Sequence, residues 1–149
     1  MHAAIKWQKE GMKFECDNNG IKTPMDHAMI EGQKAVGPSP KELLLNAMMG
    51  CTAMDVIAIL KKMRQPLEDM NVTIDAVKNT EHPIHFKHAL IEFHLQGDIA
   101  EEKALKAVNS SLTKYCGVNY MASKTCEIEY KIFINKDEKA TGKANFITP

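Results

Sequence analysis

Residues 37–62 read GPSPKELLLNAMMGCTAMDVIAILKK and contain the longest apolar run in this chain of 149 residues. Ser39 is a preferred N-cap residue, Pro40 suits the first helical position, and Glu42 completes an S-x-x-E capping box. Two lysines close the run, where they suit the carboxyl end of a helix dipole. The pattern therefore predicts one long helix from Pro40 to about Met63.

The predicted helix is apolar on nearly all sides. Its apolar residues are Leu43, Leu44, Leu45, Ala47, Met48, Met49, Ala53, Met54, Val56, Ile57, Ile59 and Leu60. Such a helix has to be enclosed on most sides, and one chain of this size has few elements to wrap it. We therefore expect a second copy of the chain to complete the enclosure. Asp55, near the middle of the run, argues against a span across a membrane.

The rest of the chain predicts an α+β fold. Period-two alternation predicts strands at 3–8, 12–17, from 21, 72–76, 88–95 and 128–134. A loop is expected at 31–38. A second helix is expected at 99–115, where Asp98 and Glu101 form a capping box at its start. This order shows no regular βαβ alternation, which is typical of the α+β class. We expect one domain over residues 1–149, with a core to about residue 135 and a polar, loosely held tail at 136–149.

Composition and charge narrow the class of partner. The chain carries 19 basic and 19 acidic residues, so its formal net charge is zero, which gives no indication of nucleic acid or an anionic membrane as partner. The N-terminal segment lacks the basic region and long apolar stretch of a signal peptide. We therefore expect a cytoplasmic protein whose four cysteines rest as thiols.

Two of the four cysteines lie in the central helix and at the end of the second helix. Cys51 has Asp55 one turn later on the same helix face, and a buried carboxylate there needs a cation or a hydrogen-bond donor nearby. Cys116 precedes Gly117 at the negative end of a helix dipole, which disfavours a thiolate unless the next turn supplies amide donors. This asymmetry favours Cys51 as the attacking thiol and Cys116 as the resolving thiol. The alternative interpretation, in which Cys51 and Cys116 are buried thiols with only a structural part, stays open.

The remaining cysteines and the histidines are better explained by structure. Cys16 and Cys126 lie in phase with the apolar faces of their strands and are predicted core residues. His82, His85 and His88 form an H-x-x-H-x-x-H pattern, but a spacing of three on a strand places neighbours on opposite faces. A solvated strand face is the preferred interpretation, and no metal site is predicted from this pattern.

Two motifs resemble a known family. Residues 37–62, with a proline eleven positions before Cys51, are followed by LTKYCGVNYMAS at 112–123. Together they resemble the OsmC/Ohr family of thiol-dependent hydroperoxide reductases, and in particular its uncharacterised OsmC-like branch. The resemblance implies antiparallel sheets packed around long central helices in an intertwined homodimer, with an active site at each subunit boundary.

The same resemblance implies a chemistry. Cys51 matches the peroxidatic cysteine, which attacks an organic hydroperoxide and becomes a sulfenic acid, and Cys116 matches the resolving cysteine, which condenses with it to a disulfide. An external dithiol then reduces the disulfide. This chemistry needs no metal, flavin or nicotinamide.

The chain also departs from the family pattern. The family has an arginine in its N-terminal region, whereas Arg64 is the only arginine here and follows the central helix. Lys22, Lys34 and His27 are candidates to replace it, and Glu42 and Asp55 are candidate supporting residues. These departures leave an alternative open, in which the dimer holds a small apolar or thiol-bearing ligand near Cys51 without peroxide turnover.

Overall fold

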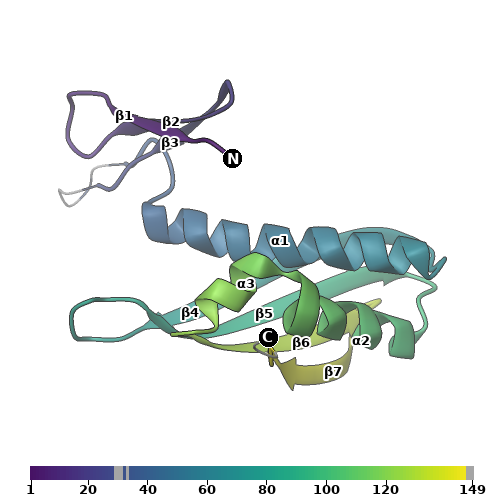
Figure 1. Ribbon diagram of the computed structural model, residues 1–149. Helices are drawn as coiled ribbons and strands as arrows, with labels where there is room; N and C mark the ends of the chain where they lie inside the picture. Colours follow the sequence, from purple (N-terminus) through teal and green to yellow (C-terminus); the bar gives the residue numbers. More distant parts are fainter. Residues whose placement is uncertain (29–31, 33, 147–149) are drawn as a thin grey trace. The chain divides into compact units, whose positions relative to one another are not determined.

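The computed structural model describes residues 1–28, 32 and 34–146. These residues form two compact units, Met1–Asn46 and Ala47–Pro149, and the helix α1 (Pro40–Lys62) begins in the first unit and continues through the second (Figure 1). Helix α1 has the predicted bounds to within one residue. The prediction of one domain over the whole chain stays a prediction.

The first unit holds a three-stranded antiparallel sheet. Its strands are β1 (Ala4–Trp7), β2 (Phe14–Asn18) and β3 (Ile21–Met25), in that order. Asn19 and Gly20, which join β2 to β3, both have positive φ angles, of 56° and 89°, as a tight Asn-Gly hairpin turn requires. The meander predicted from the alternation is confirmed.

A polar residue that the sequence analysis did not single out fixes the connection from β3 to α1. The Asp26 side chain is 4% exposed, and its carboxylate accepts hydrogen bonds from the backbone N–H groups of His27 (2.7 Å) and Val36 (3.0 Å). The Asp26 N–H in turn donates to the Pro38 carbonyl at 3.2 Å. Residues 31 and 33 of the predicted loop lie outside the described residues.

The capping box at the start of α1 is confirmed. The Glu42 carboxylate accepts hydrogen bonds from the Ser39 N–H and the Ser39 hydroxyl, both at 2.7 Å. These two bonds from Ser39 lower the pKa of Glu42 below its ordinary value. Ser39 and Glu42 together therefore satisfy backbone and side-chain groups that would otherwise be left open at the helix end.

The second unit contains a four-stranded mixed sheet. Its order is β4 (Leu67–Lys78), β5 (Phe86–Gly97), β6 (Glu127–Ile134) and β7 (Asp137–Lys143). The β5–β6 pair is parallel and the other two pairs are antiparallel. The connection from β5 to β6 runs through α2 (Glu101–Ser110), the π-helical turn η1 (Ser111–Tyr115) and α3 (Gly117–Ala122), which lie with α1 on one face of the sheet (Figure 1).

The core lies between this sheet face and the helices. From the sheet, it contains Ala89, Ile91, Phe93, Leu95, Ile128, Tyr130, Ile132 and Ile134, and from the helices, Met48, Val56, Leu60, Ala104, Ala107, Val108 and Leu112. The sheet residues alternate along β5 and β6, as a strand with one covered face requires. Cys126 is also buried, as predicted, whereas Cys16 is only partly buried.

Three sequence predictions are corrected. The β5–β6 pair is parallel and not antiparallel, because a long helical crossover separates the two strands. The segment expected to be a loose tail forms β7, whose pairing with β6 satisfies its backbone groups. Helix α2 does not begin with the predicted Asp98 capping box, since its N-cap is Ala100, whose carbonyl oxygen accepts from the N–H groups of the first turn.

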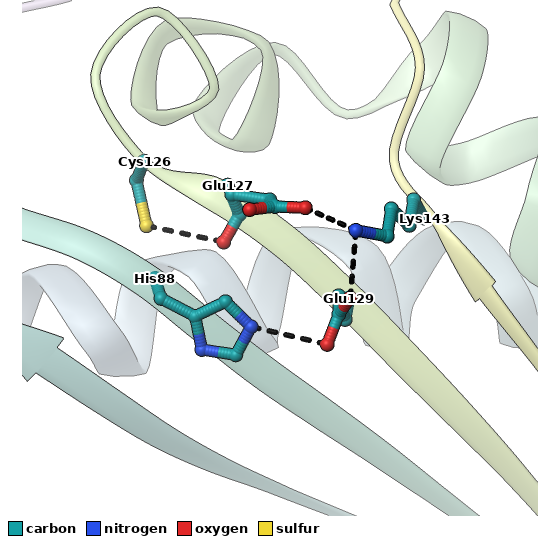
Figure 2. A network of polar contacts seen from close by, with 5 residues as sticks. All are labelled: His88, Cys126, Glu127, Glu129 and Lys143. Atoms are coloured by element: carbon teal, nitrogen blue, oxygen red, sulfur yellow. Dashed lines mark hydrogen bonds and ion pairs between the residues drawn. The ribbon is translucent and has the colours of Figure 1, made fainter.

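The other face of the sheet carries a charged network (Figure 2). His88 Nε2 lies 3.1 Å from a Glu129 carboxylate oxygen, and the Lys143 ammonium group contacts both Glu129, at 2.9 Å, and Glu127. These bonds, first from Lys143 and then from His88, lower the pKa of Glu129. His85 bonds instead to the Pro83 carbonyl oxygen, at 2.8 Å. The histidine pattern therefore places its residues in separate contacts, as the solvated-face interpretation expects.

One stripe of helix α1 is fully buried among the described residues. Met48, Thr52, Val56 and Leu60 recur every four residues and are fully buried, whereas the Met54 side chain is 68% exposed. By length and composition alone α1 could cross a membrane, and 22% of its most apolar stretch is buried. A large part of its apolar surface is therefore exposed in the part of the chain that the structure describes.

Candidate functional site

Three predicted site residues converge beside α1. The Cys51 sulfur, the Cys116 sulfur and a carboxylate oxygen of Asp55 all lie within 4.8 Å of one another. Cys51 and Asp55 are one helical turn apart on α1, and Cys116 lies between η1 and α3. The structure thus brings together two thiols that are 65 positions apart in the chain.

A widened helical turn delivers Cys116 to this cluster. The Cys116 N–H donates to the Ser111 carbonyl, five residues earlier, at 3.0 Å, where an α-helix would use the residue four earlier. Cys116 itself is extended, with φ −72° and ψ 96°, and is the N-cap of α3. The prediction that Cys116 only ends a helix is therefore incomplete, because it also begins the next one.

Asn119 supplies the donors that a thiolate at Cys116 requires. Its backbone N–H and its side-chain Nδ2 donate to the Cys116 sulfur at 3.4 and 3.2 Å. Nδ2 also donates to the Met48 carbonyl on α1, at 3.1 Å, so the same amide joins α3 to α1. Asn119 is fully buried, and its Oδ1 has no partner among the described residues. The sequence analysis required amide donors from the turn after Cys116 but did not single out Asn119 as their source.

A buried chain of hydroxyl groups holds Asp55. The Ser111 hydroxyl donates to Asp55 Oδ2 at 2.8 Å, and the Thr52 hydroxyl lies 2.8 Å from the same Ser111 oxygen. Since Ser111 gives its single hydrogen to Asp55, Thr52 donates to Ser111. In the part of the chain that the structure describes, Asp55 makes no ion pair. The donor expected near Asp55 is therefore a serine hydroxyl, which sequence reasoning missed because Ser111 is distant in the chain.

The surroundings of Cys116 favour its protonated form. Burial first, and then the neighbouring Cys51 thiol, raise the pKa of Cys116 from 9.0 to about 12, while the Asn119 donors act in the opposite direction. A proton therefore stays on Cys116 at neutral pH. This state suits a thiol that reacts second, after its partner has been oxidised.

The raised pKa of Cys116 predicts a loss of stability in alkali. The folded protein holds this proton more tightly than the unfolded chain does. Cys116 therefore contributes fully to the free energy of unfolding below pH 9.0, and this contribution is lost as the pH rises toward about 12. Between pH 9.0 and about 12, the free energy of unfolding should fall by about 1–3 kcal/mol more for the wild type than for the Cys116→Ala variant. Urea unfolding at several pH values measures this difference. Parallel stability curves for the two proteins would contradict this assignment.

A groove reaches the cluster from solvent. It has a volume of about 790 Å³ and is lined by Asp55, Ala58, Ile59, Lys62, Met63, Lys106, Ser110 and Tyr115. Its walls are mainly apolar carbon atoms, and the lining includes Asp55 and two lysines but neither Cys51 nor Cys116. A small molecule with an apolar body can therefore approach Asp55, whose carboxylate lies within 4.8 Å of both sulfur atoms.

The two other predicted supporting residues belong to the first unit. Glu42 is engaged in the capping box with Ser39, and Lys34 is exposed in the connection to α1. Their parts in the chemistry of the site stay predictions. The parts predicted for Cys51, Cys116 and Asp55 are also still to be tested in solution.

Comparison with known proteins identifies the family. A protein-family model described as OsmC-like protein matches residues 31–131. Protein YhfA of Escherichia coli K12 is 36% identical over 132 residues, which cover 87% of this chain and 95% of YhfA.

Solved structures show the same fold. A hypothetical protein from Aquifex aeolicus VF5 has a TM-score of 0.75 and 24% identity, with 90% of this chain and 96% of that chain covered. The organic hydroperoxide resistance protein OhrB of Bacillus subtilis has a TM-score of 0.66 and 13% identity, with 91% and 98% covered. Because the family model spans more than half of the sequence and YhfA matches along most of its length, this chain belongs to the OsmC-like protein family.

Proposed function

We propose that this protein reduces organic hydroperoxides with two cysteines, Cys51 as the attacking thiol and Cys116 as the resolving thiol. The observation that carries the proposal is the approach of the two sulfur atoms to within 4.8 Å, although they come from different elements. Family membership suggests a redox or peroxide-related role, and one structural neighbour is named for organic hydroperoxide resistance.

The first step is oxidation of Cys51. Its thiolate attacks the hydroxyl oxygen of the peroxide, the O–O bond breaks, and the sulfur loses two electrons to become a sulfenic acid. The leaving alkoxide takes up the proton that Cys51 gave to Asp55 and departs as an alcohol. The Asp55 carboxylate lies within 4.8 Å of the Cys51 sulfur and is the acceptor that we assign to the Cys51 proton. The apolar walls of the groove beside Asp55 suit the organic part of the substrate.

The second step joins the two cysteines. The Cys116 sulfur attacks the Cys51 sulfur, the S–O bond breaks, and the released hydroxide takes the Cys116 proton to leave as water. The sulfur atoms must then approach to about 2.05 Å. Cys116 follows a π turn and precedes a short helix, and this place between two elements allows the shift. An external dithiol returns the disulfide to two thiols.

A second candidate function rests on the groove. The groove lining includes Asp55 but neither cysteine, and Asp55 makes no ion pair among the described residues. An apolar groove without an activated thiol would suit a protein that binds a small apolar or thiol-bearing ligand without turnover.

Oxidation with one equivalent of cumene hydroperoxide separates the two functions. For the peroxidase, we expect the four free thiols of the wild type to fall to two, with a Cys51–Cys116 disulfide in the peptide mass map. Cys16 and Cys126 serve as internal controls and should stay reduced. Retention of all four thiols, or a disulfide that includes Cys16 or Cys126, would contradict the proposal.

The same proposal includes a homodimer as the functional unit. Met54, Ile57 and Leu105 are exposed by 68%, 46% and 39% on a chain considered alone. A second copy that covers the apolar side of α1 would remove this surface from water and would also limit the access of bulk solvent to the thiols.

A further inference from the structure

The Cys51, Asp55 and Cys116 cluster has the composition of a metal site as well as that of a thiol pair. Two thiolates and a carboxylate are ligands that Zn²⁺ accepts, and a tetrahedral ion with Zn–S bonds of about 2.3 Å would hold two sulfurs about 3.8 Å apart. The three ligand atoms already lie within 4.8 Å of one another. Small side-chain shifts would therefore bring them into the coordination sphere.

We propose that the reduced protein binds one thiophilic divalent cation, for which Zn²⁺ is the probe, through Cys51 Sγ, Cys116 Sγ and the Asp55 carboxylate. Binding forms two Zn–S bonds and one Zn–O bond and releases both thiol protons to solvent. Three protein ligands leave a fourth coordination position for water.

A second shell of hydrogen bonds supports each side of this site. The Ser111 hydroxyl fixes one Asp55 oxygen at 2.8 Å and leaves the other oxygen free of a hydrogen bond in the described part of the chain. The two Asn119 donors, at 3.4 and 3.2 Å, stabilise negative charge on Cys116. Partners of this kind orient metal ligands and hold them in place.

Charge distinguishes this cluster from the charged network on the outer face of the sheet. On the outer sheet face, Lys143 contacts both Glu127 and Glu129 and balances their charge (Figure 2). Among the described residues no lysine, arginine or histidine pairs with Asp55. A bound cation would supply the positive charge that two thiolates and this carboxylate lack.

Metal binding and oxidation exclude each other at this site. A sulfur that donates its lone pair to Zn²⁺ is a weaker nucleophile toward peroxide, and a disulfide no longer offers two thiolates. Oxidation of the loaded site by ROOH removes two electrons from the sulfurs, consumes two protons, and yields a disulfide, ROH, water and free Zn²⁺. The proposed metal binding does not depend on the proposed function. Only the competition between metal and peroxide rests on that function.

The test uses purified full-length protein, reduced, freed of metal with a chelator and kept anaerobic. Titration with Zn²⁺ against a chromophoric chelator should give one ion per chain, and Co²⁺ should give the charge-transfer absorption of thiolate ligands. We expect Cys51→Ser, Cys116→Ser and Asp55→Asn each to weaken Zn²⁺ binding at least about tenfold. Cys16→Ser and Cys126→Ser are matched controls and should bind as the wild type does.

Two outcomes would overturn the proposal. One is the absence of a thiolate-to-cobalt band in the wild type, a readout that needs no variant to fold. The other is Zn²⁺ binding that persists unchanged in the Cys51→Ser and Cys116→Ser proteins, which would place the ion on surface histidines.

Peroxide added to the zinc-loaded and zinc-free proteins then tests the competition. If the zinc-free protein forms no disulfide, the proposed function fails while the metal site stands.

Discussion

The Cys51→Ser variant is expected to consume organic hydroperoxide at least about 10³-fold more slowly than the wild type. Loss of the attacking group removes the covalent step itself, and substitutions of a nucleophile commonly cost this much or more. A serine hydroxyl is nearly isosteric with the thiol but does not ionise at neutral pH, so packing around α1 is preserved while reactivity is lost. The measurement is the initial rate of cumene hydroperoxide loss with a dithiol as reductant.

Two further variants show whether this loss is specific. Cys126→Ser should keep the wild-type rate, because Cys126 is buried just before β6 and its thiol donates to the Glu127 carbonyl oxygen, at 3.7 Å. Cys116→Ser should complete one oxidation per chain and then stop, with a sulfenic acid on Cys51 that a dimedone reagent labels. Full hydroperoxide consumption by Cys51→Ser would eliminate the proposed mechanism.

The Met54→Glu variant is expected to weaken self-association at least about 100-fold, which corresponds to about 3 kcal/mol. Met54 is 68% exposed on the apolar outer side of α1, so in a single chain the substitution would place a carboxylate in water at little cost. In a dimer that covers α1, the same carboxylate would be buried without a partner. Sedimentation velocity over a range of protein concentrations measures the change.

The control for this experiment changes charge away from α1. Lys78→Glu alters an exposed residue at the end of β4, and the association of this variant should match that of the wild type. A wild-type protein that is monomeric at every concentration would contradict the proposed dimer. Partition of the wild type into neutral phospholipid vesicles, abolished by Met54→Glu, would instead assign the apolar surface of α1 to a membrane.

Local signals determined much of the fold. The capping box of Ser39 and Glu42 fixes the start of α1 because both partners are within four residues, and the Asn19-Gly20 turn sets the β2–β3 hairpin for the same reason. Alternation along β5 follows from one covered face. The position of Cys51 in the central helix and the motif around Cys116 also indicated the two thiols whose sulfur atoms the structure brings within 4.8 Å.

Only the tertiary structure decided how the site is built. The hydroxyl of Ser111 reaches Asp55 across 56 positions, and Asn119 reaches the Met48 carbonyl across 71 positions, and no local pattern encodes such pairs. The π turn that makes Cys116 an N-cap is likewise set by packing and not by propensity. The physical reason is range: helix ends and turns depend on neighbours in sequence, whereas the site depends on side chains that meet only after the helices have packed on the sheet.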